Sequence, residues 1–284
     1  MKSAIITGAS RGIGFETALA FARAGYNVFA TVRNPDGVAE LKETAARESL
    51  PIKVLKMDVN SDESVNDCIH AIYEETDTID VLVNNAGIER HGSIEEMTLT
   101  DFRDVMETNY FGVLRCTKAV IPQMRASRDG CIINISSVAG KIANTPLGAY
   151  APTKHALEAV SEALAQELKQ HHIRVVIVQP GIIDTDMAQA LKPGVSSIYP
   201  QVNRFGGLFQ ASLKSPRPSS MVADKILEIA DSSSWQLRHP VGPDAAPFLG
   251  WRGTMTDEQW VDWNAAEDEV WFDAVQNTFG MDVR

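Results

Sequence analysis

Residues 3–14 have the sequence SAIITGASRGIG, in which a short apolar run leads directly into a turn with three glycines. The run Ser3–Thr7 is almost continuously apolar, as expected for a strand covered on both faces in a parallel sheet. Gly8, Gly12 and Gly14 permit a tight turn and a close approach of the backbone to a diphosphate at the N-terminus of a following helix. A glycine-rich turn alone is weak evidence. Its position between a first strand and a first helix predicts an α/β fold with a nucleotide site.

The same alternation of strands and helices continues to about residue 180. We expect strands at 3–7, 27–32, 53–58, 80–84, 131–136 and 174–179, and helices near 12–24, 37–49, 61–75, 101–125 and 151–170. A further helix at 220–231 and a short strand at 239–241 would close the sheet. Such alternation implies right-handed crossovers. We therefore predict a doubly wound parallel sheet (a Rossmann-type α/β fold) with strand order 3-2-1-4-5-6-7. Since no linker or internal repeat is evident, a single domain spans 1–284.

Charge and cysteine content restrict the partners and the compartment. The net charge is −11, and the segment from Gly253 to Arg284 accounts for −7 of it, with eight acidic residues and one basic residue. An acidic protein is poorly suited to bind nucleic acid. Cys68, Cys116 and Cys131 lack metal-ligand or redox spacing, which favours small core residues in a reducing compartment. No apolar run approaches membrane-spanning length and no signal peptide fits before the first strand. We expect a cytoplasmic protein without a membrane partner.

Polar or glycine-rich signals follow the later strands of the predicted sheet. They are Asp58-Val59, Asn84–Gly87, Ser136-Ser137, the pair Tyr150 and Lys154, and Pro180–Thr185. Because ligands of open α/β sheets bind at the carboxyl ends of the strands, these five signals are expected at one edge and in one site. Chance could supply one or two of them, but all five in this order indicate a functional site.

Tyr150 and Lys154 carry the chemistry that this edge suggests. Residues four apart share one face of a helix, so both side chains can point into the same small volume. A tyrosine has a pKa of roughly 10 and is a poor acid–base catalyst at neutral pH unless a nearby charge stabilises its anion. A lysine ammonium can do so. Pro152 is compatible with this arrangement, because proline is tolerated in the first turn of a helix.

The chain resembles the short-chain dehydrogenase/reductase family in its compact single-domain branch. The matching motifs are TGASRGIG, DV, NNAG, Asn109 within TNYFG, ISS, YAPTK and PGIIDT, and they cover about residues 1–185. Jointly these motifs are highly specific. The stretches ATVR and YxxxKHALE are also similar to the hydroxysteroid and retinol dehydrogenase branch. The resemblance implies an oxidoreductase that needs no metal.

The resemblance implies a role for each catalytic position. Tyr150 would be the general acid/base, and Lys154 would lower its pKa and bind the nicotinamide ribose. Ser137 would polarise the carbonyl and stabilise the developing alkoxide. Asn109 would hold a water in the proton relay, although it could also satisfy backbone groups in a bent helix. Ser136 is the alternative to Ser137, but side chains alternate along a strand and the spacing to Tyr150 favours Ser137.

Cofactor contacts follow from the same motifs. NAD-preferring members carry an acidic residue after the second strand, where it accepts hydrogen bonds from the ribose and repels a 2′-phosphate. Here that stretch is Ala30–Asn34, and Arg33 offers a guanidinium fork for phosphate, with Arg11 as a second positive charge. We therefore expect NADP(H) rather than NAD(H). The expected contacts are Gly8, Ser10, Arg11, Gly12, Ile13, Gly14, Arg33, Asp58, Val59, Asn85, Ala86, Gly87, Tyr150, Lys154, Pro180, Gly181, Ile183 and Thr185, the last of these to the carboxamide.

Residues beyond the motifs bear on the substrate. Residues 186–219 show little regular periodicity and contain many Pro, Gly and Ser, as in a substrate lid or loop beside a cofactor site. The apolar residues of this segment, together with Ile88, Ile142 and Leu147, indicate an apolar pocket. His91 follows the NNAG turn, where a loop histidine in solvent is expected and a substrate contact is the alternative.

A Trp-rich acidic extension covers 251–284. All five tryptophans fall within the last fifty residues, and Thr256 with Gln259 forms a capping-box signature for one final helix. Trp260, Trp263, Trp271 and Phe272 would share one face of that helix. Core packing or a subunit contact is favoured there over stacking on substrate.

The resulting hypothesis is an NADP(H)-dependent alcohol dehydrogenase or ketoreductase for hydrophobic ketones or secondary alcohols, with aromatic or steroid-like compounds as the expected examples. Hydride would pass between nicotinamide C4 and the carbonyl carbon. A 3-oxoacyl-thioester reductase is an alternative, and a regulator that binds NADP(H) without turnover is another. An intact Ser/Tyr/Lys/Asn set speaks against the regulator. By resemblance, the helices at 101–125 and 151–170 would form a homodimer or homotetramer interface.

Overall fold

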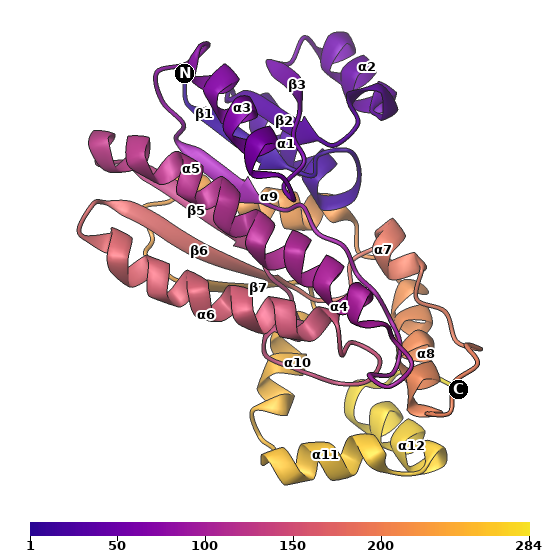
Figure 1. The fold of residues 1–284 in the computed structure, drawn as a ribbon. Coiled ribbons are helices and arrows are strands. Elements are labelled where there is room, and N and C mark those ends of the chain that lie inside the picture. The colour runs from indigo at the N-terminus through magenta and orange to yellow at the C-terminus, as the bar shows by residue number, and fades with distance from the viewer.

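A seven-stranded, wholly parallel sheet organises the protein (Figure 1). The computed structural model describes all residues from Met1 to Arg284. The strand order β3-β2-β1-β4-β5-β6-β7 confirms the predicted topology. The strands are β1 (Ser3–Thr7), β2 (Asn27–Val32), β3 (Ile52–Lys56), β4 (Val81–Asn84), β5 (Gly130–Ile135), β6 (Ile173–Pro180) and β7 (Arg238–Val241).

Helices cover both faces of this sheet, which explains why its strands are apolar throughout. They are α1 (Gly12–Arg23), α2 (Ala39–Glu48), α3 (Asp62–Tyr73), α5 (Gly112–Ser127), α6 (Tyr150–Lys169) and α9 (Ser219–Asp231). Neighbouring residues of one strand serve opposite faces, since Ile6 packs in the core with α1 and α9 whereas Ile5 packs in the core with α3 and α5. The period of two along each strand therefore produces two separate cores.

The segment predicted as one helix over 101–125 is divided. It consists of α4 (Leu99–Met106), a π-helical turn (Glu107–Phe111) and α5. The π turn holds Asn109, which is fully buried. Such bulges widen a helix locally and frequently occur at functional sites.

The prediction of an irregular segment at 186–219 is wrong in part. It contains α7 (Asp186–Gln189) and α8 (Gln201–Leu213). Gly206 and Gly207 obscured the helical pattern in the sequence because they serve close packing here. A Cβ on Gly206 would lie 2.5 Å from the nitrogen of Pro193, and one on Gly207 would lie 2.5 Å from the carbonyl oxygen of Val283.

The C-terminal extension forms three helices, so the prediction of one final helix is also wrong. They are α10 (Ala245–Arg252), α11 (Asp257–Ala265) and α12 (Asp268–Phe279), which lie together beyond one end of the sheet (Figure 1). The capping box at Thr256 and Gln259 is present and starts α11. The backbone turns to an extended ψ of 162° at Ala266, which ends α11 and starts a new helix direction. No helix is both long and apolar enough to cross a membrane.

Candidate active site

A cavity of about 360 Å³ lies along the carboxyl ends of the strands. It is lined by all the residues that the sequence assigned to cofactor or catalysis, with two exceptions. Gly14 and Asn109 are buried and do not reach its surface. Ile88, Ile142 and Leu147 line the cavity, as do Met187, Phe205 and Phe209 of the 186–219 segment. The structure therefore brings the separate sequence motifs to one place.

The glycine-rich turn is locked to the NNAG turn by short-range contacts. Thr7 Oγ1 accepts hydrogen bonds from the backbone N–H groups of Asn85 and Ala86, each at 3.0 Å. Asn85 Nδ2 donates in return to the carbonyl oxygens of Thr7 and Gly8, at 2.9 and 3.1 Å. A Cβ on Gly14 would lie 2.4 Å from Asn85 Nδ2, and one on Gly8, whose φ is +68°, would lie 2.8 Å from the Cα of Ala86. Only glycine fits these positions, so the turn stays open to a diphosphate at the start of α1.

Positive charge lies where a 2′-phosphate would be held. Arg33 follows β2, lines the cavity, is exposed and has no ion pair in the structure. Arg11 also lines the cavity, but its guanidinium pairs with Asp186 at 3.0 Å across the surface. An exposed pair of this kind contributes at most about 1 kcal/mol, so it leaves Arg11 able to exchange partners. The residues present fit a phosphorylated dinucleotide, with Arg33 as the free cation.

Lys154 is buried one helical turn from Tyr150 on α6. Its ammonium donates to the carbonyl oxygen of Ile135 at 2.8 Å and lies 5.5 Å from the centroid of the Tyr150 ring. Burial lowers the pKa of Lys154 to about 8, while the carboxyls of Glu89 and Glu158 oppose that shift. The hydrogen bond at the end of β5 holds the ammonium in position beside the tyrosine.

Tyr150 departs from the expectation that Lys154 lowers its pKa. Burial raises the pKa of this hydroxyl, the negative charge of Glu89 raises it further, and a hydrogen-bonding interaction with Ser137 is what lowers it. Desolvation of the phenolate in this buried position sets the direction of the shift. In the protein without nucleotide, Tyr150 therefore stays protonated at neutral pH, which is the form that donates a proton.

Ser137 is better placed for catalysis than Ser136. Both serines line the cavity. Ser137 starts a 3₁₀ turn and accepts a hydrogen bond from the N–H of Ala139 at 3.1 Å. Ser136 Oγ is buried without a hydrogen-bond partner, and it lies so close to Gly140 that a Cβ there would be 2.6 Å away. The alternation of side chains at the end of β5 thus directs the two hydroxyls differently.

Asn109 acts on the backbone after β4. Its Oδ1 accepts from the N–H of Ile88 at 2.9 Å, and its Nδ2 donates to the Ile88 carbonyl at 2.9 Å and to Thr153 Oγ1 at 3.1 Å. Both amide hydrogens are thereby used, which leaves one lone pair on Oδ1 for any water. The structure shows Asn109 joining the NNAG segment to α6, as the backbone-satisfying interpretation proposed.

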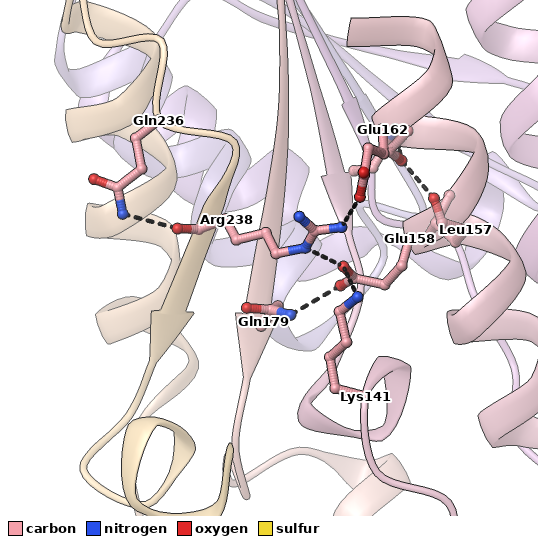
Figure 2. Close-up of polar contacts among 9 residues, drawn as sticks. Lys141, Leu157, Glu158, Glu162, Gln179, Gln236 and Arg238 are labelled. Carbon is pink, nitrogen blue, oxygen red and sulfur yellow. Dashed lines mark hydrogen bonds and ion pairs between the residues drawn. The ribbon is translucent and has the colours of Figure 1, made fainter. Parts of the chain in front are cut away.

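An ionic network around the buried carboxylate of Glu158 was missed by sequence reasoning (Figure 2). Glu158, one turn after Lys154, is 2% exposed and accepts from Gln179 Nε2 at 3.0 Å and Arg238 Nε at 2.8 Å. Arg238 also donates to Glu162 at 2.6 Å, and Lys141 lies 3.8 Å from Glu158. These contacts connect α6 to β6, to β7 and to the turn after Ser137. They fix the helix that carries Tyr150 and Lys154 against the sheet.

The tryptophan-rich helices form a wall of the same cavity. Residues of the C-terminal extension that line it are Phe248, Trp251, Trp260, Trp263, Trp271, Val275 and Phe279. The rings also pack on one another, with centroids 4.8 Å apart for Trp251 and Trp263 and 5.3 Å apart for Trp263 and Trp271. The same rings therefore pack on one another and line the cavity.

Two polar anchors hold this wall in place. Trp260 Nε1 donates to the carbonyl oxygen of Ala143 at 2.8 Å, in the segment after Ser137. Arg204 of α8, 6% exposed, pairs with Asp268 at 2.6 Å and donates to the carbonyl oxygens of Asn264 and Ala266. The concentration of tryptophans pointed to this region, but no local pattern indicated its partners.

Glu89 and His91 are the remaining ionisable groups near Tyr150. Glu89 lines the cavity with its side chain 9% exposed, and His91 contacts its carboxyl. Burial raises the pKa of Glu89 to about 8 and lowers that of His91 to about 4. The prediction of His91 as a solvent-exposed loop residue is wrong, because its side chain is 24% exposed.

Known proteins share both the sequence and the fold. The family model for short chain dehydrogenases matches residues 2–196. The oxidoreductase BOA17 of Botryotinia fuckeliana is 32% identical over 90% of this chain and 95% of its own. Human retinol dehydrogenase 8 is 40% identical over 69% of this chain and 63% of its own length. The 3-oxoacyl-[acyl-carrier-protein] reductase FabG of Pseudomonas aeruginosa is 40% identical over 67% of this chain and 77% of its own.

Solved structures share the fold over most of the chain. A short-chain dehydrogenase from Streptomyces avermitilis has a TM-score of 0.79 and 32% identity, covering 92% of this chain and 95% of its own. An alcohol dehydrogenase from Thermococcus sibiricus, complexed with 5-hydroxy-NADP, has a TM-score of 0.72 and 26% identity, covering 84% and 95%. With the sheet order, the glycine-rich turn and the family match in agreement, this chain belongs to the short-chain dehydrogenase family and is an oxidoreductase of carbonyl or alcohol substrates that uses a nicotinamide nucleotide.

Proposed function

We propose that the protein is an NADP(H)-dependent ketoreductase or alcohol dehydrogenase acting on hydrophobic, aromatic ketones or the corresponding secondary alcohols. The observation that carries this proposal is that Tyr150 and Ser137 line a cavity that aromatic side chains of the C-terminal helices also line. Aromatic and aliphatic walls with a few placed polar groups are typical of sites for apolar small molecules.

The proton chemistry follows from the side chains present. Ser137 donates a hydrogen bond to the substrate carbonyl oxygen and stabilises negative charge as it develops there. Tyr150, protonated because burial raises its pKa, transfers its proton to that oxygen. Lys154 keeps its ammonium beside the resulting phenolate, with Ile135 as its fixed partner. Asn109 keeps the Ile88 backbone at its place next to the reacting groups.

NADP(H), held between the glycine-rich turn and the NNAG turn, would supply or accept the hydride. Arg33 supports NADP(H) over NAD(H), because its guanidinium follows β2, lines the cavity and has no acidic residue next to it in the sequence. The Thermococcus sibiricus neighbour in complex with an NADP analogue supports the same choice.

The names of relatives suggest two kinds of carbonyl substrate. Human retinol dehydrogenase 8 suggests a large apolar alcohol or aldehyde, and the 3-oxoacyl-[acyl-carrier-protein] reductase suggests a thioester. Of these, the aromatic wall favours the first. A 3-oxoacyl thioester remains the second candidate and belongs in any substrate panel.

Oxidation of NADPH against a panel of ketones tests the proposal. Aryl ketones and polycyclic ketones should be turned over faster than short aliphatic ketones and an acetoacetyl thioester. Tyr150→Phe should lower kcat by about 10²–10⁴-fold, the usual contribution of a general acid, while NADPH binding followed by fluorescence is retained. Binding of NADPH without turnover of any ketone or alcohol would instead support a sensor.

The proposal includes a homodimer or homotetramer in the cytoplasm. Phe111, at the start of α5, is 44% exposed, which is compatible with a contact along α5 and α6. All three cysteines are free and buried, as in a reducing compartment. Light scattering after gel filtration measures the assembly, and a monomer that is fully active would contradict this part.

A further inference from the structure

Asp244 carries a part-buried carboxyl directly before α10 that the proposed reaction does not use. An aspartate in this position is expected to cap the helix, yet its side chain forms no capping hydrogen bond. Its Oδ2 instead accepts the backbone N–H of Ile182 at 2.7 Å, 62 residues earlier in the chain. The carboxyl therefore joins the start of the C-terminal helices to the segment that follows β6.

Two glycines let this carboxyl pack directly against the backbone. A Cβ on Gly181 would lie 2.6 Å from Asp244 Oδ2, and one on Gly242, whose φ is +105°, would lie 2.9 Å from Oδ1. Oδ1 itself is buried without a hydrogen-bond partner. A carboxylate that only capped a helix at the surface would keep this oxygen in water, so the close packing indicates a different role.

The contact holds two successive N–H groups of the segment after β6. The N–H of Gly181 donates to the carbonyl oxygen of Val241 at 2.9 Å, and the N–H of Ile182 donates to Asp244. The first of these bonds joins two backbone groups, so a change of side chain does not remove either partner. The second depends on the Asp244 side chain alone and can be removed by mutation.

Gly181 and Ile182 line the cavity at the end where hydride transfer would take place. In the strand order, β2 with Arg33 lies on one side of β1, and β5 with Ser137 lies on the other. A dinucleotide with its diphosphate at the start of α1 and its 2′-phosphate at Arg33 therefore extends its nicotinamide toward β5. Because β6 is the next strand after β5, the backbone held by Asp244 lies beside that end of the nucleotide.

We propose that Asp244 is a positioning residue for the nicotinamide end of the cofactor, because it fixes the backbone of Gly181 and Ile182. The inference rests on the proposed function and adds a residue to it. Phe248 and Trp251 follow Asp244 on α10 and line the same cavity, and Phe248 belongs to one apolar cluster with Ile182. One carboxyl thus ties the nicotinamide edge to the first helix of the substrate wall. A misplacement of about 1 Å between reacting groups can cost about 100-fold in rate, so this geometry matters.

Two nucleotides that differ in the nicotinamide ring test the proposal by isothermal titration calorimetry. NADPH carries the ring, and 2′-phospho-ADP-ribose lacks it. Asp244→Ala should raise the Kd of NADPH about 10-fold, the effect of one hydrogen bond to a charged group, and leave the Kd of 2′-phospho-ADP-ribose unchanged. Asp244→Asn keeps an oxygen for the Ile182 N–H, so it should bind NADPH within about threefold of the wild type.

Gly181→Ala tests the same contact from the other side, because its methyl group would displace the carboxyl. It should weaken NADPH binding as Asp244→Ala does, and the double variant should be no weaker than Gly181→Ala alone. This variant decides the question if Asp244→Ala does not fold. Glu267→Ala is the matched control, since Glu267 also precedes a C-terminal helix without a capping hydrogen bond but is exposed. It should leave both Kd values unchanged.

The proposal is overturned if Asp244→Ala weakens both nucleotides equally, as a purely structural residue would, or weakens neither. It is also overturned if Asp244→Asn binds NADPH as poorly as Asp244→Ala does, because the hydrogen bond to Ile182 would then not be the cause.

The two Kd values also separate this inference from the proposed function. If no ketone is turned over, the proposed reaction fails, but the ratio of the two Kd values still decides the role of Asp244. If NADH binds more tightly than NADPH, NADH and ADP-ribose form the equivalent pair. If ketones are reduced and Asp244→Ala binds both nucleotides like the wild type, the inference fails and the reaction stands.

Discussion

Two regions of the molecule line one cavity and are built differently. The sheet edge that carries the glycine-rich turn, the NNAG turn and Tyr150 is held by backbone geometry and by hydrogen bonds such as those of Thr7 and Asn85. The wall formed by α10–α12 is held by ring packing and by two anchors, Trp260 and Arg204. The first region presents fixed polar groups, and the second presents apolar surface. We propose that the sheet edge binds the nucleotide and transfers the proton, and that the C-terminal helices retain the substrate.

A pH dependence of stability should localise to the sheet edge. Burial raises the pKa of Glu89 to about 8, so the folded state holds a proton that the unfolded state releases above pH 4.5. Stability from this group is therefore lost as pH rises from about 5 to 8. Lys154, lowered to about 8, acts in the higher window, where stability is lost as pH falls from 10.5 toward 8.

Glu89→Gln should remove the lower slope. From pH 5 to pH 8, the free energy of unfolding of the wild type should fall relative to that of the variant by on the order of 2 kcal/mol, measured by urea denaturation. Asp262→Asn, an exposed change on α11, should show no such trend. If the free energy of unfolding varies with pH equally in the wild type and in Glu89→Gln, the Glu89 carboxyl does not cause the pH dependence.

Arg33→Asp should change the preference between NADPH and NADH and leave substrate preference unchanged. Replacing a free guanidinium with a carboxylate removes a phosphate contact and introduces repulsion, so the NADPH/NADH ratio of kcat/KM should fall by about 100-fold. If the division of labour is correct, the fall is the same for every ketone. An unchanged NADPH/NADH ratio would show that Arg33 does not contact the 2′-phosphate. A ratio that depends on the ketone would show that Arg33 also affects the substrate.

The contrast between the two regions also explains what could be predicted from sequence. Each sheet-edge motif depends on residues close together in the chain, so Gly8, Gly14 and Asn85 could be identified by type and spacing. The role of Glu158 could not, because its partners Gln179 and Arg238 are 21 and 80 residues away. The motif identified Asn109 as a site residue but left two roles open. Its hydrogen bond to the backbone of Ile88 is visible only in the structure.

The C-terminal wall was the hardest part to predict. The spacing of its tryptophans in the sequence does not distinguish a face that packs in the core from a face that lines the cavity. The same rings do both. The close approach of Gly207 to Val283 depends on chain segments 76 residues apart, and local propensity says nothing about it. Likewise, a sequence shows that Tyr150 and Lys154 share a helical face, but not that burial would raise the pKa of the tyrosine.

Arg204→Met should loosen the wall and leave the nucleotide site intact. The change removes an ion pair and two hydrogen bonds to the α11–α12 connection while keeping an unbranched apolar stem. With Asp268 half-exposed and able to regain water, the loss should be about 2 kcal/mol, which corresponds to a roughly 30-fold rise in KM for a bulky aryl ketone. The KM for NADPH should stay constant, and limited proteolysis should cut near 264–268 sooner than in the wild type. A rise in KM for NADPH of the same size would contradict the separation of the two regions.

Trp260→Phe is the smallest and most selective change, because it keeps an aromatic ring in the wall and removes one donor. The Ala143 carbonyl then loses its partner at 2.8 Å, and it belongs to the segment that follows Ser137. A neutral hydrogen bond of this kind contributes about 1 kcal/mol, so KM for the aryl ketone should rise about fivefold with kcat nearly constant. Trp235→Phe, an exposed tryptophan outside the wall, serves as the control and should have no effect on either constant. Should kcat fall instead while KM holds, the bond to Ala143 would be positioning Ser137, and the C-terminal helices would take part in the chemistry that the comparison assigns to the sheet edge.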